Sequence, residues 1–336
     1  IEDEVLIGMN RRDPRLFDVY RLNIATGELT LIEENPGDIE EWMTDHDGKL
    51  RVAIRTDGVN RSLLYRDRED YPFRTLLTTD FRESVSPLFF TFDNKKLYVS
   101  SNLGRNTSAI FVFDPEKAAH EELVFEHPEV DVYALFRSKK RKVITGTGYT
   151  TDRFRYHFFD EERATLQKEL ESRLPGYEVT VTSMNKEEDK VLLHAGSDRT
   201  QGAYYFFDMK TKDFRKLADL SPWLPEERLA PMKPVQYTAR DGLTIHGYLT
   251  LPAGSDGKNL PVVVNPHGGP WARDTWGYDS EAQFLANRGL AVLQMNFRGS
   301  TGYGRKHWES SFKQWGKTMQ DDITDGVNWL VKQGIA

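Results

Sequence analysis

The sequence contains no cysteine. Because disulfides, thiolate zinc sites, iron–sulfur clusters and cysteine nucleophiles all need a thiol, each of them is excluded. Long hydrophobic runs are also missing: the longest, around Leu260–Val264, has about five residues, whereas a membrane-spanning helix needs about 20. Positive charge is in the minority, with 45 Lys and Arg against 52 Asp and Glu and a net charge of −7. The chain is therefore expected to bind neither nucleic acid nor a membrane.

What remains is the composition of an ordinary globular protein. The 336 residues are 38% hydrophobic and 29% charged, which excludes disorder and suits about two domains of roughly 100–200 residues each. The chain begins at Ile1 without a charged and apolar leader. A cytoplasmic location is favoured, and a periplasmic or secreted one stays open if a leader has been removed.

A repeat runs through the first two thirds of the chain. Aromatic or apolar runs end in Asn or Asp at intervals of 44, 47, 46 and 48 residues, at Asn23, Asp67, Asp114, Asp160 and Asp208. A second marker, the first apolar residue after a polar turn, recurs at intervals of 47, 46 and 48 residues, at Leu50, Leu97, Val143 and Val191. Two markers that share one period indicate a structural repeat.

The repeat predicts a partial β-propeller of four to five blades over residues 1–220. A period of about 40–50 residues with roughly four short strands is typical of a propeller blade. The terminal Asp and Asn are expected to close hairpin turns and to carry no chemistry. Whether these blades close by themselves or form part of a longer ring stays open.

A proline-rich stretch then interrupts the pattern. It contains Pro222, Pro225, Pro231 and Pro234, and proline fixes φ and removes a backbone donor. The charge changes here as well, from a net −9 before residue 232 to +2 after it. We therefore predict a linker at 221–234, between the blades (1–220) and a second domain (235–336).

Residues 235–336 alternate between predicted strands and helices, which indicates a parallel sheet. Asp241-Gly242 is a hairpin turn, Ser280 with Gln283 forms a capping box, and Thr318 with Asp321 forms a capping pair. The predicted elements are a hairpin at 235–251, a buried strand at 261–265, a helix from 280 to before Gly289, a strand at 290–295 and a helix at 318–333.

Two glycine-rich loops follow the predicted strands. The first is His267-Gly268-Gly269-Pro270, and in α/β-hydrolases an HGGG-type segment at this place supplies a backbone donor to the oxyanion hole. A glycine-rich turn without a catalytic role is an equal alternative. The second, Asn296–Gly304, lacks the spacing of a phosphate-binding loop, and its Arg298 is expected to tie the loop together.

These loops, followed by Trp315-Gly316 and Asp321-Asp322 and preceded by a propeller, resemble the prolyl oligopeptidase family of serine peptidases. Within it the chain is most similar to the acylaminoacyl-peptidase and oligopeptidase branch. The resemblance implies a propeller that gates an α/β-hydrolase domain, substrates that are short peptides or acyl-peptides, and no cofactor. It also implies that the backbone N–H groups of Gly268 and Gly269 form the oxyanion hole, with Gly269 favoured.

The sequence departs from this family in one respect. None of its serines has glycine at both −2 and +2, as the G-x-S-x-G nucleophile elbow requires; Ser300 has Gly302 after it but Arg298 before it. The triad follows the order Ser, Asp, His in this fold, so all three are expected beyond Ala336. The chain is thus interpreted as an internal part of a larger peptidase that is inactive alone.

Other candidate residues are given structural roles. The eight histidines lack metal-ligand spacing, so no metal is expected. His267 is expected to order its loop, and Asp321 and Asp322 to favour a helix dipole. Trp271 and Trp276 either line the substrate cleft or pack on the propeller, and packing is favoured. A propeller that binds peptides or proteins without catalysis, or an esterase, are the alternative functions, and formation of a homo-oligomer stays open.

Overall fold

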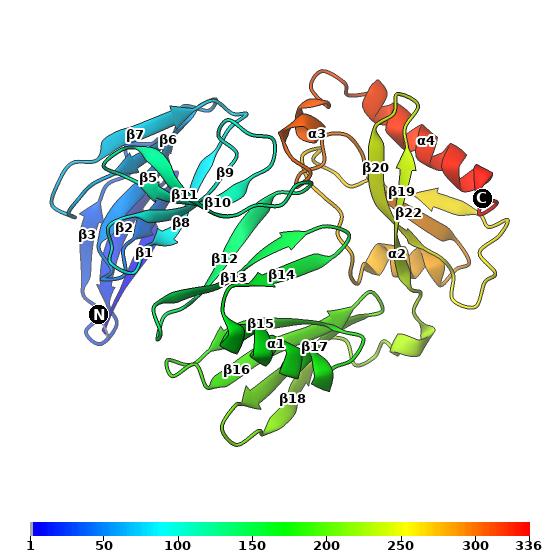
Figure 1. Cartoon of the computed structure of the whole chain (residues 1–336), viewed down its shortest axis with the longest axis horizontal. Coiled ribbons are helices and arrows are strands. Elements are labelled where there is room, and N and C mark those ends of the chain that lie inside the picture. Colours follow the sequence, from blue (N-terminus) through cyan, green and yellow to red (C-terminus); the bar gives the residue numbers. More distant parts are fainter. Residues whose placement is uncertain (1–2) are drawn as a thin grey trace. The chain divides into compact units, whose positions relative to one another are not determined.

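The computed structural model describes residues 3–336 and consists mainly of antiparallel sheets that follow one another along the chain (Figure 1). The first three sheets are β1 (Glu4–Asp13), β2 (Leu16–Asn23) and β3 (Leu29–Glu33); β4 (Ile39–Thr44), β5 (Leu50–Thr56), β6 (Arg61–Tyr65) and β7 (Arg74–Thr79); and β8 (Val85–Phe90), β9 (Leu97–Ser101), β10 (Ala109–Asp114) and β11 (Ala119–Phe125). The next two are β12 (Val132–Ser138), β13 (Val143–Thr150) and β14 (Phe154–Phe158); and β15 (Glu178–Met184), β16 (Lys190–Ser197), β17 (Thr200–Asp208) and β18 (Phe214–Asp219).

The repeat seen in the sequence coincides with these sheets. Neighbours in the chain are neighbours in each sheet, as in propeller blades, which confirms the predicted fold class. Leu50, Leu97 and Val191 are at most 1% exposed, so the second marker is mainly a core position. The first marker closes turns: the Asp114 carboxylate accepts the backbone N–H of Glu116 at 2.8 Å.

The fourth repeat contains a helix that the sequence did not predict. Asp160 does not close a hairpin; it is the N-cap of α1 (Glu161–Arg173), and its carboxylate accepts the N–H of Arg163 at 2.9 Å. Leu166 and Leu170 of α1 pack in one core with Val179 and Val191. α1 therefore follows β14 where other sheets have a fourth strand.

The C-terminal part is a mixed sheet with helices. Its strand order is β19-β20-β22-β21, in which β21 and β22 are parallel and the other pairs are antiparallel. This confirms the expected start of an α/β-hydrolase domain. The elements are the 3-10 helix η1 (Glu226–Arg228), β19 (Met232–Thr238), β20 (Thr244–Thr250), β21 (Val262–Val264), α2 (Ser280–Ala286), β22 (Ala291–Asn296), α3 (Arg305–Glu309) and α4 (Thr318–Lys332).

Three local predictions for this region were wrong. Asp279, not Ser280, caps α2, and Gln283 instead bonds the backbone of Ala230 and Asp198 at 2.8–2.9 Å. α4 begins after Lys317 without a side-chain cap, so Thr318 and Asp321 form no capping pair. The strand predicted to be buried at 261–265 is β21 at the edge of the sheet, and its valines are therefore partly exposed.

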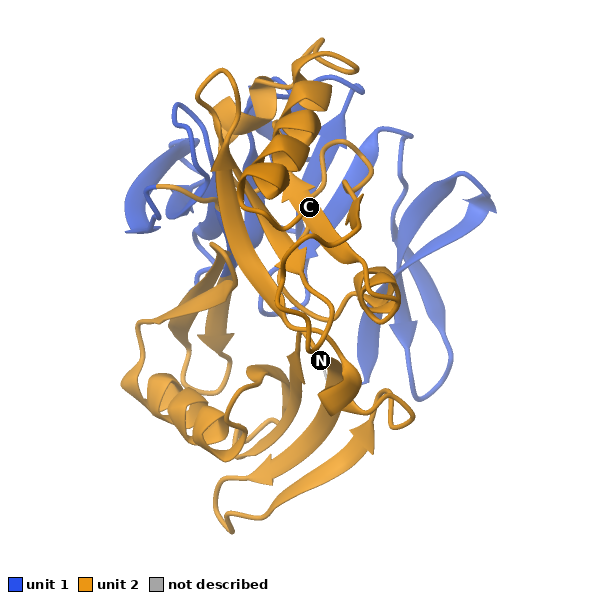
Figure 2. Ribbon diagram, turned by 90° about the vertical axis from the view of Figure 1, so that its right-hand side faces the viewer, with its two compact units in different colours: residues 1–128, 132–134 blue, residues 129–131, 135–336 orange. Residues whose placement is uncertain are grey.

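Contacts divide the chain into two compact units, residues 1–128 with 132–134, and residues 129–131 with 135–336 (Figure 2). The first unit has its own core around Leu63, Phe90 and Leu97. The second has one core around Leu193 and Phe207 and another around Leu293 and Leu330. Every residue of the candidate site described next belongs to the second unit, while the domain limits at 1–220, 221–234 and 235–336 remain predictions.

Candidate active site

The loop after β21 exposes two adjacent glycines. Gly268 and Gly269 are both solvent-exposed, and neither backbone amide donates to another group within residues 3–336. Gly269 has a φ of +129°, and a Cβ there would lie 2.8 Å from the backbone nitrogen of Trp271. This position therefore requires glycine. Two solvent-exposed residues of this loop thus have backbone N–H groups without an acceptor in residues 3–336, and an anionic oxygen needs such donors.

His267 fixes the orientation of this peptide group. Its Nδ1 lies 2.9 Å from the Gly268 carbonyl oxygen, and its ring stacks on Phe297 with 4.6 Å between centroids. A carbonyl only accepts, so Nδ1 carries the proton of this bond. The Gly268 C=O and the Gly269 N–H belong to one planar trans peptide and point in opposite directions. Holding the carbonyl therefore also aims the Gly269 N–H away from His267.

The loop after β22 supports the first loop. Asn296, fully buried, accepts the N–H of Asp274 at 2.8 Å and donates to the Asp274 carbonyl at 3.0 Å. The Thr301 N–H donates to the Ala272 carbonyl at 2.9 Å. The Trp271 indole N–H reaches the Ser311 hydroxyl at 3.2 Å. The two glycine-rich loops are thus one hydrogen-bonded structure.

Arg298 ties the second loop to the sheet and to α4, as the sequence predicted. Its Nε and Nη2 donate to both carboxylate oxygens of Asp322 at 2.8 and 2.7 Å, and its Nη1 pairs with Asp241 at 2.8 Å. Hydrogen bonding to Asp322 raises the pKa of the Arg298 guanidinium further. Asp322 is 0% exposed, so it serves this structural pair and has no access to a substrate.

Ser300 forms a serine–histidine contact that has no nucleophilic role. The His267 Nε2 lies 2.8 Å from the Ser300 hydroxyl, a distance typical of a nucleophile and its base. However, Ser300 is 0% exposed, and its hydroxyl also lies 2.7 Å from the Phe297 carbonyl. A hydroxyl without access to solvent cannot attack a substrate. The contact instead anchors His267 from the side opposite Gly268.

Two tryptophans near the loop have different environments. Trp276 is 8% exposed, and its indole N–H donates to the Met232 carbonyl at 2.9 Å, so it packs as expected. Trp271 is 50% exposed, although its ring contacts Trp308 and Phe312.

Tyr303, which sequence reasoning did not single out, is a further buried group beside the second loop. It accepts from Asn296 at 2.9 Å and stacks on His246 with 5.0 Å between ring centroids. Burial raises the pKa of the Tyr303 hydroxyl to about 12, so it is neutral at physiological pH. The roles of Asn296, Asp274 and Ser300 were missed too; Asn296 and Ser300 lie inside a motif that the sequence displayed, and Asp274 lies shortly after the other motif.

Residues 3–336 contain no cluster of three or more His, Asp or Glu that could hold a metal ion. Within the same residues, no helix combines the length and hydropathy that crossing a bilayer would require.

The fold and the loops together define a class of protein. In this class, propeller-type sheets are followed by an α/β-hydrolase sheet, and an exposed glycine pair follows one of its parallel strands. Solved structures share this architecture. A Mycobacterium tuberculosis puromycin-hydrolyzing peptidase aligns with 99% of this chain and 54% of its own, with a TM-score of 0.71 and 19% sequence identity.

Sequence comparisons identify the family. Residues 276–336 match the model of the prolyl oligopeptidase family. Dipeptidyl aminopeptidase BIII of Pseudoxanthomonas mexicana is 35% identical over 98% of this chain and 49% of its own length. The acylamino-acid-releasing enzyme of Sus scrofa is 36% identical over 30% of this chain and 13% of its own. The chain belongs to the prolyl oligopeptidase family, and it spans about half the length of the first of these relatives.

Proposed function

We propose that this chain is part of a serine peptidase that hydrolyses short peptides or acyl-peptides, and that Gly269 supplies an oxyanion-hole donor, assisted by Gly268. One observation carries the proposal: Gly269 is solvent-exposed, its N–H has no acceptor in residues 3–336, and the His267–Gly268 hydrogen bond orients its peptide group. A donor fixed before the reaction stabilises the charge that develops on the carbonyl oxygen. The names of the relatives, an aminopeptidase and an acylamino-acid-releasing enzyme, agree with this substrate class.

We further propose that the 336-residue chain does not catalyse by itself. It holds the donor of the oxyanion hole but no serine in a nucleophile elbow, and the serine that touches a histidine is fully buried. The propeller-type sheets would then limit access to the site. The second glycine-rich loop would serve as the support of the first.

The experiment uses the longer protein that carries this segment. A serine-directed phosphonate should label it at one serine outside residues 1–336, and the labelled protein should lose peptidase activity. The 336-residue chain should hydrolyse no peptide and take up no label. An unlabelled, active longer protein, or a purified chain that cleaves peptides, would each contradict the proposal.

The role of Gly269 is tested separately in the longer protein. Gly269→Ala forces an L-residue into a φ of +129° and against Trp271, so the amide moves, and kcat should fall by about 10²–10³-fold. Gly268→Ala is the matched control, because a Cβ there meets nothing within 4 Å. Equal losses of kcat in the two variants would contradict the special role of Gly269.

A further inference from the structure

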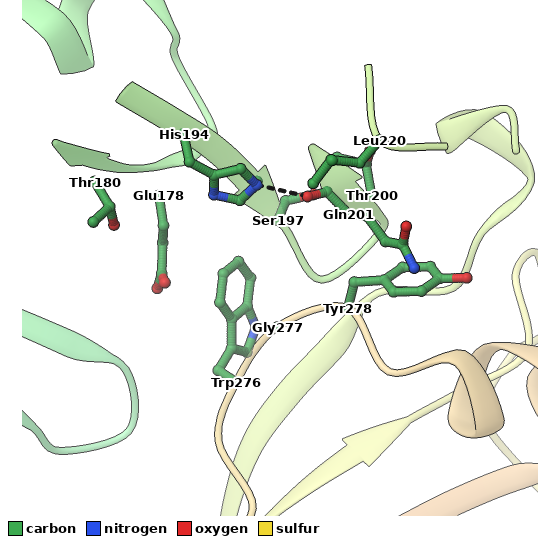
Figure 3. Close-up of a pocket in the computed structure, with 11 residues that line it drawn as sticks. Glu178, Thr180, His194, Ser197, Thr200, Gln201, Leu220, Trp276, Gly277 and Tyr278 are labelled. Carbon is green, nitrogen blue, oxygen red and sulfur yellow. Dashed lines mark hydrogen bonds between the residues drawn. The ribbon is translucent and has the colours of Figure 1, made fainter. Parts of the chain in front are cut away.

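A second pocket lies apart from the glycine pair, between the last propeller-type sheet and the segment that precedes α2. It has a volume of about 430 Å³. Its walls come from β15, β16 and β17 on one side, with Glu178, His194 and Gln201, and from Trp276 and Tyr278 on the other. Figure 3 shows Glu178, His194 and Trp276 around the same space. All of these residues belong to the second unit.

The lining of the pocket contains one carboxylate, that of Glu178. Its lining contains no Lys or Arg. Glu178 is half-buried, and its carboxylate has no hydrogen bond or ion pair within the part of the chain that the structure describes. The Nε2–H of His194 donates to the backbone carbonyl of Gln201 at 2.7 Å, so this donor is already used within the chain. A cation is therefore better suited to this pocket than an anion.

The nearest cations do not neutralise Glu178 by contact. Arg153 lies over the Trp276 ring at 3.6 Å, and Arg155 pairs with Asp152 at 2.8 Å. Partial burial raises the pKa of the Glu178 carboxyl, and the two arginines counteract this only through space. Placing a cation beside Glu178 would relieve the cost of burying its charge.

The local backbone makes room for the His194 ring in the wall of the pocket. The register of β16 with β17 shifts between Ala195 and Ser197, which is a bulge that re-aims neighbouring side chains. At Gly196 in this bulge, a Cβ would lie 2.9 Å from Cε1 of His194. Gly196 thus leaves room for the imidazole ring.

We infer that this pocket binds the basic side chain of a peptide, lysine or arginine, with Glu178 receiving the charged group. The apolar walls of Leu220, Trp276 and Tyr278 fit the aliphatic stem of such a side chain, and the polar end of the pocket fits its head. A volume of about 430 Å³ accommodates the whole side chain and not only an ammonium group. The inference rests on the proposed function only in taking a peptide as the ligand.

The test measures binding to the 336-residue chain by calorimetry, without turnover. The ligand is acetyl-Ala-Lys-Ala-amide, in which both ends are blocked, and the reference is the same peptide with norleucine in place of lysine. We expect the lysine peptide to bind about tenfold more tightly, because only its side chain forms a charge-assisted hydrogen bond. Equal affinities, or no binding of the lysine peptide, would overturn the inference. A third peptide, Ala-norleucine-Ala-amide, has a free N-terminal ammonium group and no basic side chain. If it binds more tightly than the blocked lysine peptide, the pocket prefers an N-terminus to a side chain, and the inference is overturned.

Two variants assign the effect to this pocket. Glu178→Gln keeps the shape but loses the charge, and Thr180→Lys places a cation in the lining; both should abolish the preference for lysine over norleucine. Glu227→Gln, at an exposed glutamate outside the pocket, should leave it unchanged. An unchanged preference in Glu178→Gln and Thr180→Lys would refute the assignment. Because no catalysis is measured, this outcome is distinct from a failure of phosphonate labelling.

Discussion

Two neighbouring aspartates at the start of α4 differ strongly in what they hold in place. Asp322 is fully buried against Arg298, while Asp321 is 40% exposed and pairs with Arg240. Removing one partner of a buried ion pair leaves the other charge uncompensated. We therefore expect Asp322→Asn to lower the free energy of unfolding by about 3–5 kcal/mol.

Asp321→Asn is the adjacent control for this prediction. An exposed ion pair contributes little, so this variant should change the free energy of unfolding by less than about 1 kcal/mol. Urea unfolding followed by circular dichroism gives both values. Similar losses in the two variants would show that the Arg298–Asp322 pair is not the anchor of the second glycine-rich loop.

His307 makes stability depend on pH. Burial lowers its pKa from about 6.5 to about 4 in the folded chain, where its Nε2 lies 3.2 Å from the Phe297 carbonyl. Between these values the unfolded chain binds a proton that the native chain does not, so stability falls as pH falls through this range. The loss should reach up to about 3 kcal/mol at the acid end.

The measurement is urea unfolding at about pH 7.5 and about pH 5, on the parent chain and on His307→Gln. Other histidines titrate in both proteins, so the difference between the two pH dependences isolates His307. The variant should lose less stability on acidification than the parent. Parallel pH profiles would contradict the assigned pKa of His307.

At the scale of the element, α1 depends on its N-cap, Asp160. Asp160 caps the helix and also forms two hydrogen bonds of 2.7 Å with Arg141. Asp160→Ala loses both functions and should cost about 1–2 kcal/mol of unfolding free energy, whereas Asp160→Asn keeps a capping oxygen and should cost less. Thermal unfolding monitored by circular dichroism compares the two. If alanine and asparagine cost the same, the cap does not stabilise α1.

The same element shows where sequence patterns fail. Asp160 ends an aromatic run like the other four markers, yet it begins a helix, because an Asp side chain closes a turn and caps a helix with the same hydrogen bond to a backbone N–H. Ser280 fits a capping box by spacing, but Asp279 takes the position one residue earlier. The local pattern thus located α2 but not its N-cap, whereas at α1 it missed the helix itself.

At the scale of the whole molecule, the two compact units have separate hydrophobic cores. We expect unfolding that is not two-state, with one transition for each unit. Leu97→Ala, in the first core, should lower the stability of one transition by about 2–5 kcal/mol and leave the other unchanged. Asp322→Asn should affect only the second. Differential scanning calorimetry of both variants decides this, and a single transition shifted by either substitution would contradict it.

The fold could be predicted from the sequence at this scale because the blade repeat and the order of the two loops are visible along the chain. Neither depends on which distant residues are in contact. The sequence did not predict how the loops are joined. The contact between His267 and Ser300 spans 33 residues, and that between Asp274 and Asn296 spans 22. Such pairs are set by the parallel alignment of β21 and β22, which brings the ends of both strands to one edge.

The guanidinium of Arg298 has a consequence for protein engineering. It joins the hairpin turn at Asp241, the loop at 297–301 and Asp322 near the start of α4, three segments that are remote in the sequence. A designer who grafts the short His-Gly-Gly-Pro segment onto a foreign scaffold would leave behind the Phe297 ring and the Ser300 hydroxyl that hold His267. The smallest transferable piece extends from the hairpin turn at Asp241 through Asp322 in α4.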